Sequence, residues 1–243
     1  MKNNAISINA LDGHKLSGYL AHPQGTPKGG VIVLQEIFGV TSHIRQVTDS
    51  FARHGYLALA PALFDRLEAG IELDYTAVET GIALMQKLKL DEVAHDLKAT
   101  LAALRRELAA IPGAGSKVGA VGYCWGGSIA DLAACRTDIS AAVSYYGRAT
   151  VGWLDEQPRC PVLYHFGALD PLIPPELVQQ ITAGRPGQTV HVYPGAGHGF
   201  NCNDRHEFHA ASAELALKRT LEFFKRHVGC ATVLAGDRQC PMP

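Results

Sequence analysis

A chain of 243 residues with 47% hydrophobic and 19% charged residues is long enough and apolar enough to bury one full core. Its 22 basic and 23 acidic residues give a formal net charge of −1 and lie mixed along the chain, which argues against a nucleic-acid partner. No apolar run is long enough to span a membrane, and residues 1–10 lack the apolar segment of a signal peptide, so no membrane partner is expected.

The order of expected elements predicts an α/β protein. The first is an antiparallel hairpin, 5–10 and 16–22, because Asp12-Gly13 is a typical hairpin turn. Beyond the loop 23–30, strands and helices alternate, which predicts a mostly parallel central sheet with helices on both faces. Strands are expected at 31–35, 56–60, 117–123, 141–146, 162–166 and 189–193, and helices near 42–54, 74–89, 91–110, 125–135, 175–183 and 205–227.

Residues 1–228 are expected to form a single domain of this class. Residues 229–243 show little periodicity, and we expect a C-terminal tail that is either disordered or packed against a partner subunit. The six Cys residues form neither CxxC pairs nor the spacing of a small disulfide scaffold. A reduced, cytoplasmic protein is therefore expected. The sequence does not indicate an oligomeric state.

The most informative segment is Gly122-Tyr123-Cys124-Trp125-Gly126, at the junction of an expected strand and an expected helix. It follows the GxSxG nucleophile elbow of α/β-hydrolases with Cys in place of Ser, in which small residues permit a cramped turn that exposes one side chain. The turn also places Cys124 at a helix N-terminus, whose partial positive charge favours thiolate over thiol. The alternative is that Cys124 is an unreactive, buried residue.

Two residues beyond Cys124 complete a candidate catalytic triad. Asp170 lies on the loop after the strand 162–166, where a carboxylate can orient an imidazole. His198 lies on the glycine-rich loop that follows the strand 189–193 and can reach a neighbouring strand end. The chain order of nucleophile, acid and His is the order that α/β-hydrolases use.

Several landmarks are shared with a known family. They are Gln35-Glu36-Ile37-Phe38-Gly39-Val40 with Ile44 and Arg45, Gly122 to Gly127, Tyr145-Tyr146-Gly147, Asp170 and the His198 loop. On these residues the chain resembles the dienelactone hydrolases, or carboxymethylenebutenolidases. The resemblance implies an α/β-hydrolase fold that cleaves a small-molecule ester or lactone through an acyl-enzyme. It also implies Cys124 as nucleophile, His198 as base, Asp170 as its orienting acid and Glu36 as a carboxylate close to the thiol.

An oxyanion hole and a control on the thiol are expected around these residues. The backbone N–H groups of Trp125, just after the nucleophile, and of Ile37, after the strand 31–35, are the expected oxyanion donors. A carboxylate at Glu36 opposes ionisation of Cys124, so the resemblance suggests a thiol that stays neutral until substrate displaces the carboxylate. The alternative is a structural carboxylate, for instance in a salt bridge with Arg45.

The sequence departs from the family at the substrate. Dienelactone-hydrolysing members hold the substrate carboxylate with arginines, one in the helix after Asp74 and one four residues after the catalytic His. Here the segment 67–86 contains no Arg, Cys202 stands four residues after His198, and Arg205 is out of register. A neutral or differently held ester, lactone or thioester is thus expected at least as readily as a dienelactone. The expected substrate-binding residues are Phe38, Tyr145, Phe200 and Arg205.

Other function classes stay open. One is a noncatalytic protein in which Cys124 serves redox sensing, and another is acyl transfer or peptidase activity on short peptides. The eleven His residues form no metal-binding motif and no nucleotide-binding motif occurs, so neither a metal nor a cofactor is expected. A surface or capping role is expected for four of them, His43, His54, His95 and His227.

Overall fold

The computed structural model describes residues 4–229. Its strands form one eight-stranded sheet in the order β1-β2-β4-β3-β5-β6-β7-β8. The pairs β1–β2 and β2–β4 are antiparallel, and the five other pairs of neighbours are parallel. This architecture confirms the predicted fold class, including the N-terminal hairpin. The strands are β1 (Ala5–Asn9), β2 (Lys15–Ala21), β3 (Gly30–Leu34), β4 (Leu57–Pro61), β5 (Val118–Tyr123), β6 (Ala141–Tyr145), β7 (Val162–Gly167) and β8 (Thr189–Tyr193).

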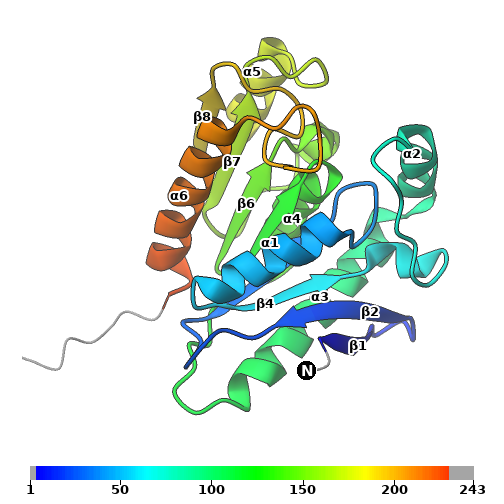
Figure 1. Cartoon of the computed structure of the whole chain (residues 1–243), viewed down its shortest axis with the longest axis vertical. Helices are drawn as coiled ribbons and strands as arrows, with labels where there is room; N and C mark the ends of the chain where they lie inside the picture. Colours follow the sequence, from blue (N-terminus) through cyan, green and yellow to red (C-terminus); the bar gives the residue numbers. More distant parts are fainter. Residues whose placement is uncertain (1–3, 230–243) are drawn as a thin grey trace, which may run out of the picture.

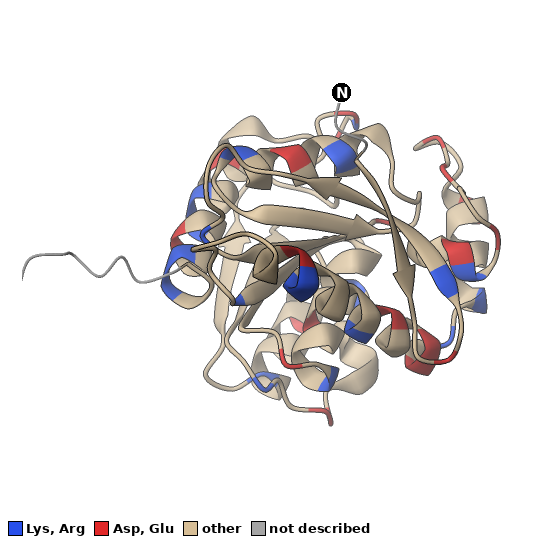
Figure 2. Cartoon of the chain, turned by 90° about the horizontal axis from the view of Figure 1, so that it is seen from below, with Lys and Arg blue, Asp and Glu red and all other residues tan. Residues whose placement is uncertain are grey.

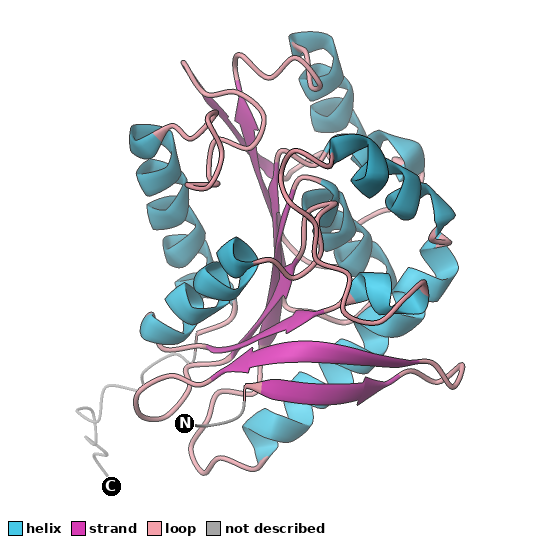
Figure 3. Cartoon of the chain, turned by 45° about the vertical axis from the view of Figure 1, so that its right-hand side comes forward, coloured by secondary structure: helices cyan, strands magenta, loops and turns pink. Residues whose placement is uncertain are grey.

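Helices cover both faces of the sheet. Helices α1 and α6 lie on one face and α3 and α4 on the other (Figures 1 and 3). Strands β3, β5, β6 and β7 are buried along their whole length, which is why they appear in the sequence as continuous apolar runs. Acidic and basic residues are interspersed over the outer elements (Figure 2). The helices are α1 (Ser42–Arg53), α2 (Val78–Lys87), α3 (Leu90–Ala109), α4 (Trp125–Arg136), α5 (Pro175–Gly184) and α6 (Ala210–His227), with 3₁₀ helices η1 (Leu63–Arg66) and η2 (Arg148–Trp153).

The structure differs from the expected elements at two helix starts. Helix α2 begins at Val78, because Asp74 Oδ1 accepts hydrogen bonds from Thr76 N at 2.8 Å and Thr76 Oγ1 at 2.6 Å and so forms a turn. Helix α6 begins at Ala210, because turns precede it and the His209 side chain caps its first turn. The two 3₁₀ helices were not predicted. The expected tail, 229–243, lies outside the described residues except for Gly229. No helix among the described residues is long and apolar enough to cross a membrane.

A buried ion pair fixes α4 against the segment that follows α5. Arg185 Nε lies 2.9 Å from Asp131 Oδ1 and Arg185 Nη2 lies 2.8 Å from Asp131 Oδ2, with both side chains fully buried. The Trp153 indole N–H donates to Asp131 Oδ2 at 2.8 Å. Because α4 is the helix that follows Cys124, this pair anchors the element on which the candidate nucleophile depends.

We expect Arg185→Met to lower the free energy of unfolding by about 3–5 kcal/mol, because it leaves the Asp131 carboxylate buried without a partner. Urea denaturation, with the midpoint and slope compared with those of the wild type, measures this loss. Arg105→Met is the matched control, since its ion pair with Asp138 is exposed and its loss should cost less than about 1 kcal/mol. Equal losses in the two variants would show that the buried pair has no special structural role.

Candidate active site

The turn between β5 and α4 holds Cys124 in a strained conformation. Its φ is 55° and its ψ is −119°, a region that a residue with a side chain rarely adopts. Glycines make the turn possible, because a Cβ at Gly122 would collide with the carbonyl of Gly126. A Cβ at Gly126 would collide with the carbonyls of Leu34 and Gln35, at the end of β3. The sulfur is consequently partly exposed at the C-terminal edge of the sheet.

The three residues of the candidate triad form a continuous chain of contacts. His198 Nε2 lies 3.2 Å from Cys124 Sγ, and His198 Nδ1 lies 2.8 Å from Asp170 Oδ2. The second carboxylate oxygen, Asp170 Oδ1, accepts a hydrogen bond from Leu172 N at 2.8 Å. A proton on Nδ1 that is donated to Asp170 leaves Nε2 as the atom that exchanges a proton with the sulfur.

Hydrogen bonds between two loops hold Asp170 and His198 in register. Leu169 N donates to Ala196 O at 2.8 Å, and Ala168 N donates to Tyr193 O at 2.9 Å. These bonds connect the loop after β7 to the loop after β8 and hold the Asp170 carboxylate beside the His198 imidazole.

The surroundings of His198 favour its protonated form. Burial lowers the pKa of the imidazole, but the nearby Cys124 sulfur and the hydrogen bond to Asp170 raise it more, to about 10. An imidazolium beside the sulfur stabilises a thiolate, which is the reactive form of Cys.

Two residues with a free backbone N–H line the same cavity as Cys124. Trp125 is the first residue of α4, so its N–H has no partner within the helix, and Ile37 follows β3. Neither N–H donates a backbone hydrogen bond within the described part of the chain. Both residues line the cavity that contains Cys124 and His198, so their N–H groups are suited to bind an oxyanion.

Glu36 is buried behind this cavity with an unusual lack of partners. It is 1% exposed, and among the described residues no group within 3.5 Å donates to its carboxylate oxygens, while the Tyr75 side chain lies near enough to stabilise its charge. Its nearest cation is Arg205, whose Nη1 lies 3.7 Å from Glu36 Oε1. The salt bridge considered with Arg45 does not form, because Arg45 pairs with Glu72 at 2.7 Å. Burial raises the pKa of Glu36, while the charges of Arg205, His43 and His198 and the Tyr75 hydroxyl oppose that rise.

The cavity at Cys124 is small and mostly apolar. Its volume is about 290 Å³. Val78, Ile82 and Leu172, which are 41%, 39% and 51% exposed, form an apolar rim, so the cavity fits a small acyl group. The lining residues are Ile37, Phe38, Val78, Ile82, Met85, Gln86, Cys124, Trp125, Tyr146, Arg148, Ala149, Leu172, His198 and Arg205.

The expected substrate-binding residues divide into two groups. Phe38 and Arg205 line the cavity. Tyr145 and Phe200 do not, and the expectation that they bind substrate is not met, because both are fully buried in the core. The Tyr145 hydroxyl lies 2.7 Å from Thr220 Oγ1 on α6, and the Phe200 ring packs against Tyr145 at 6.1 Å between centroids.

Arg148 was not predicted as a site residue. It is exposed, lines the cavity and makes no ion pair with another described residue. It follows β6 by three residues. Residues just beyond the carboxyl ends of parallel strands commonly bind ligands, so its position could have identified it. No acidic residue of the described chain lines the cavity, and Arg148 and Arg205 leave it with positive charge.

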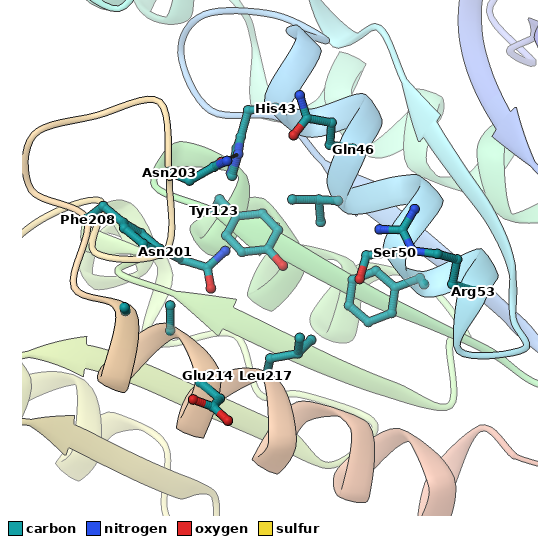
Figure 4. A pocket seen from close by; sticks show the side chains of 14 residues that line it. His43, Gln46, Ser50, Arg53, Tyr123, Asn201, Asn203, Phe208, Glu214 and Leu217 are labelled. Carbon is teal, nitrogen blue, oxygen red and sulfur yellow. Dashed lines mark hydrogen bonds between the residues drawn. The ribbon is translucent and has the colours of Figure 1, made fainter.

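A larger cavity, of about 520 Å³, lies between α1 and α6 (Figure 4). Its lining includes Tyr123, Asn203 and Glu214 but neither Cys124 nor His198. His43, expected at the surface or at a cap, is in fact 3% exposed in the wall of this cavity, with Nδ1 2.9 Å from Asn203 Oδ1. The reactive groups, rather than the volume, identify the smaller cavity as the candidate active site.

Comparison with known proteins agrees with this geometry. The model of the dienelactone hydrolase family matches residues 16–228. The chain belongs to this family. Membership confirms the predicted family and the predicted enzyme class, a hydrolase that acts on ester or lactone bonds. The carboxymethylenebutenolidases of Pseudomonas putida and Pseudomonas knackmussii are each 33% identical over 92% of this chain and 96% of their own lengths.

Solved structures extend the comparison to the fold. A crystal structure from Klebsiella pneumoniae covers 93% of this chain and 100% of its own, with 30% identity and a TM-score of 0.78. A dienelactone hydrolase-like promiscuous phosphotriesterase from metagenomic libraries covers 93% of this chain and 98% of its own, with a TM-score of 0.74. At 22% identity the second likeness shows the fold alone.

The variant Glu36→Gln tests the influence of the buried carboxylate on Cys124. Burial raises the pKa of Glu36 above its ordinary value of 4.5, so the wild type gains this negative charge only as the pH rises through the raised value. We expect iodoacetamide to alkylate both proteins alike at low pH and to alkylate the variant faster as the pH rises, because a negative neighbour disfavours thiolate.

The pH dependence of the alkylation rate, with the site of modification confirmed by mass spectrometry, is the measurement. Glu207→Gln is the matched control, because it removes the other carboxylate that pairs with Arg205 without touching Glu36. Identical rates for Glu36→Gln and wild type at every pH would leave Glu36 without influence on the sulfur.

Proposed function

We propose that this dienelactone hydrolase family member uses Cys124 as its nucleophile and cleaves a small ester or lactone through an acyl-enzyme. The observation that carries the proposal is the continuous contact chain from Cys124 Sγ through His198 to Asp170, with distances of 3.2 Å and 2.8 Å. A strained turn at the nucleophile and a cavity at its sulfur support it.

In the first half of the reaction, His198 Nε2 holds the proton of Cys124 and the thiolate attacks the acyl carbon, so that an S–C bond forms. The N–H groups of Ile37 and Trp125 donate to the negative oxygen of the tetrahedral intermediate. The intermediate then collapses, the C–O bond breaks, and His198 returns the proton to the leaving oxygen. Asp170 keeps the imidazole in the required tautomer and stabilises the imidazolium.

In the second half, water hydrolyses the thioester. His198 Nε2 takes a proton from the attacking water, a second tetrahedral intermediate forms at the same oxyanion donors, and the thiolate of Cys124 leaves. The free acid departs and the Cys124–His198 pair is restored. For a lactone, both halves of the substrate leave as one molecule, because the leaving oxygen belongs to the acyl group.

Glu36 adjusts the charge of this site. When ionised it opposes the thiolate, and when protonated it does not. Glu36 is buried, and Arg205 is its only ion-pair partner among the described residues. This supports a carboxyl group whose protonation changes when a substrate binds in the cavity. We propose that substrate binding shifts this balance and so activates the thiol.

The charge of the cavity supports a substrate with one negative group. Arg148 and Arg205 line the cavity without any acidic residue of the described chain beside them. Arg205 shares its charge with Glu36 and Glu207, while Arg148 is free to bind a carboxylate. These two residues supply positive charge that the family's usual arginine positions lack here, so we propose an ester or lactone that carries a carboxylate.

Replacement of the triad residues tests the mechanism. We expect Cys124→Ala, His198→Ala and Asp170→Asn each to lower kcat on an aryl ester by roughly 10³-fold or more, with the fold intact. The triple variant should lose little more than the worst single variant, because the three residues act as a unit. Steady-state kinetics and circular dichroism are the measurements. Losses that multiply across the variants would contradict a triad, and full activity of Cys124→Ala would exclude Cys124 as the nucleophile.

Replacement of Arg148 tests the proposed substrate charge. We expect Arg148→Gln to raise KM about tenfold for 4-nitrophenyl hemisuccinate, because a charge-assisted hydrogen bond is lost. The KM for neutral 4-nitrophenyl butyrate should not change. Arg159→Gln, which removes an exposed charge outside the cavity, is the matched control. A wild type that prefers the neutral ester would contradict the proposal and restore the expectation of a neutral substrate.

A further inference from the structure

Helix α2 is attached to the rest of the chain in an unusual way. Figure 1 shows it at the margin of the molecule, beside the C-terminal edge of the sheet. Of its residues, Val78 to Lys87, Gly81 is the only buried one. Three neighbours of Gly81 on the helix, Val78, Ile82 and Met85, line the active-site cavity. The helix therefore lines the cavity with these three side chains, packs on the core through the partly buried Leu84 and Met85, and has Gly81 as its one buried residue.

The surface on which Gly81 rests is the backbone of Ile37. A Cβ at Gly81 would lie 2.5 Å from the Ile37 carbonyl oxygen and 3.1 Å from its Cγ1, closer than real Cβ contacts permit. Gly81 does not have a positive φ, so its backbone does not require glycine. In a helix interior glycine is also less favourable than alanine. Close approach to Ile37 is thus the reason that this helix contains glycine here.

The segment before α2 holds the same loop at two further points. Leu73 N donates to Phe38 O at 2.9 Å, and Glu72 forms a β-bridge with Gly39. Outside this bridge, Arg45 binds both Glu72, at 2.7 Å, and the Val40 carbonyl, at 2.5 Å. The residues from Glu72 to Gly81 therefore follow the loop from Ile37 to Val40 along its length and fix its backbone.

We propose that Gly81 is a positioning residue for catalysis, which sets the position of the Ile37 backbone through its close approach to the Ile37 carbonyl. The inference rests on the proposed function, in which the Ile37 N–H stabilises the oxyanion. The Ile37 N–H and the Ile37 carbonyl belong to adjacent peptide planes that meet at the Ile37 Cα. A side chain at position 81 that displaces Ile37 as a whole therefore also moves its N–H away from the oxyanion. Helix α2 also lines the cavity, so an acyl group that packs against the helix maintains the contact between Gly81 and Ile37. Part of the binding energy of the acyl group therefore raises kcat.

The matched pair Gly81→Ala and Ala83→Gly separates this role from a merely structural one. Gly81→Ala raises helix propensity but pushes on Ile37, whereas Ala83→Gly lowers helix propensity at an exposed position of the same helix. We expect Gly81→Ala to lower kcat for 4-nitrophenyl butyrate roughly tenfold or more, with KM within about twofold of wild type. Ala83→Gly should keep kcat within about twofold of wild type. If α2 serves only as a stable wall, the order of the two variants is reversed.

Two further measurements locate the defect. Affinity for a trifluoromethyl ketone, which forms a tetrahedral adduct, should fall with kcat in Gly81→Ala, while the rate of Cys124 alkylation by iodoacetamide should not change, since alkylation forms no oxyanion. Arg45→Met removes the link between Glu72 and Val40 without a clash, and it should lower kcat and ketone affinity in the same direction. If Gly81→Ala does not fold, Arg45→Met alone tests whether the position of the loop from Ile37 to Val40 controls kcat.

The outcomes also distinguish the inference from the proposed function. Wild-type kcat and ketone affinity in Gly81→Ala, or an equal loss in Ala83→Gly, would overturn the role of Gly81 and leave the triad untouched. If the wild type binds the trifluoromethyl ketone no better than the corresponding methyl ketone, no oxyanion site exists at Cys124. That result would overturn the proposed function and this inference together.

Discussion

The first turn of α4 approaches the ends of β3 and β6 more closely than any side chain permits, and this contact determines the active site. A Cβ at Gly126 would collide with the carbonyls at the end of β3, and one at Gly127 would collide with the carbonyl of Tyr145 at the end of β6. The helix N-terminus is thereby inserted between two strand ends, and Cys124 takes its positive φ of 55° as a result. Ile37 and Arg148, which follow those strands, line the same cavity as Cys124.

The residues that line the cavity beside Cys124 make it electropositive. The imidazole of His198, whose pKa is raised to about 10, and the guanidiniums of Arg148 and Arg205 all face a small apolar space. Positive groups in a space that excludes water stabilise a thiolate, an oxyanion and a substrate carboxylate alike. Three carboxylates of the described chain that do not line the cavity pair with these groups: Asp170 with His198, and Glu36 and Glu207 with Arg205. Burial raises the pKa of Glu36, so the charge beside Arg205 changes with pH.

The fold and the reactive groups could be predicted because they follow from local rules. Alternating strands and helices define the sheet, and a strand, a glycine-flanked nucleophile and a helix define the elbow. The residues that face the substrate depend instead on how strand ends turn. Tyr145 was expected in the pocket, but successive residues of a strand point to opposite faces, and Tyr145 points to Thr220 on α6. Tyr146, with a φ of 42°, lines the cavity in its place, and no sequence pattern predicts that turn.

The conformation of the loop after His198 explains why the position four residues later, Cys202, does not supply a cation to the cavity. The spacing of four residues that the family uses assumes a particular path after the catalytic His, and here the chain follows another. Gly199 has a φ of 80°, and a Cβ there would lie 3.0 Å from Arg205 Cζ, so the missing side chain makes room for the guanidinium to fold back beneath the loop. Arg205, seven residues after His198, thus reaches the cavity and Glu36. The candidate triad lies at the sheet edge, whereas Arg148 and Arg205 lie in the segments beyond it. The first follows from local sequence patterns, and the place of Arg148 in the cavity required the structure.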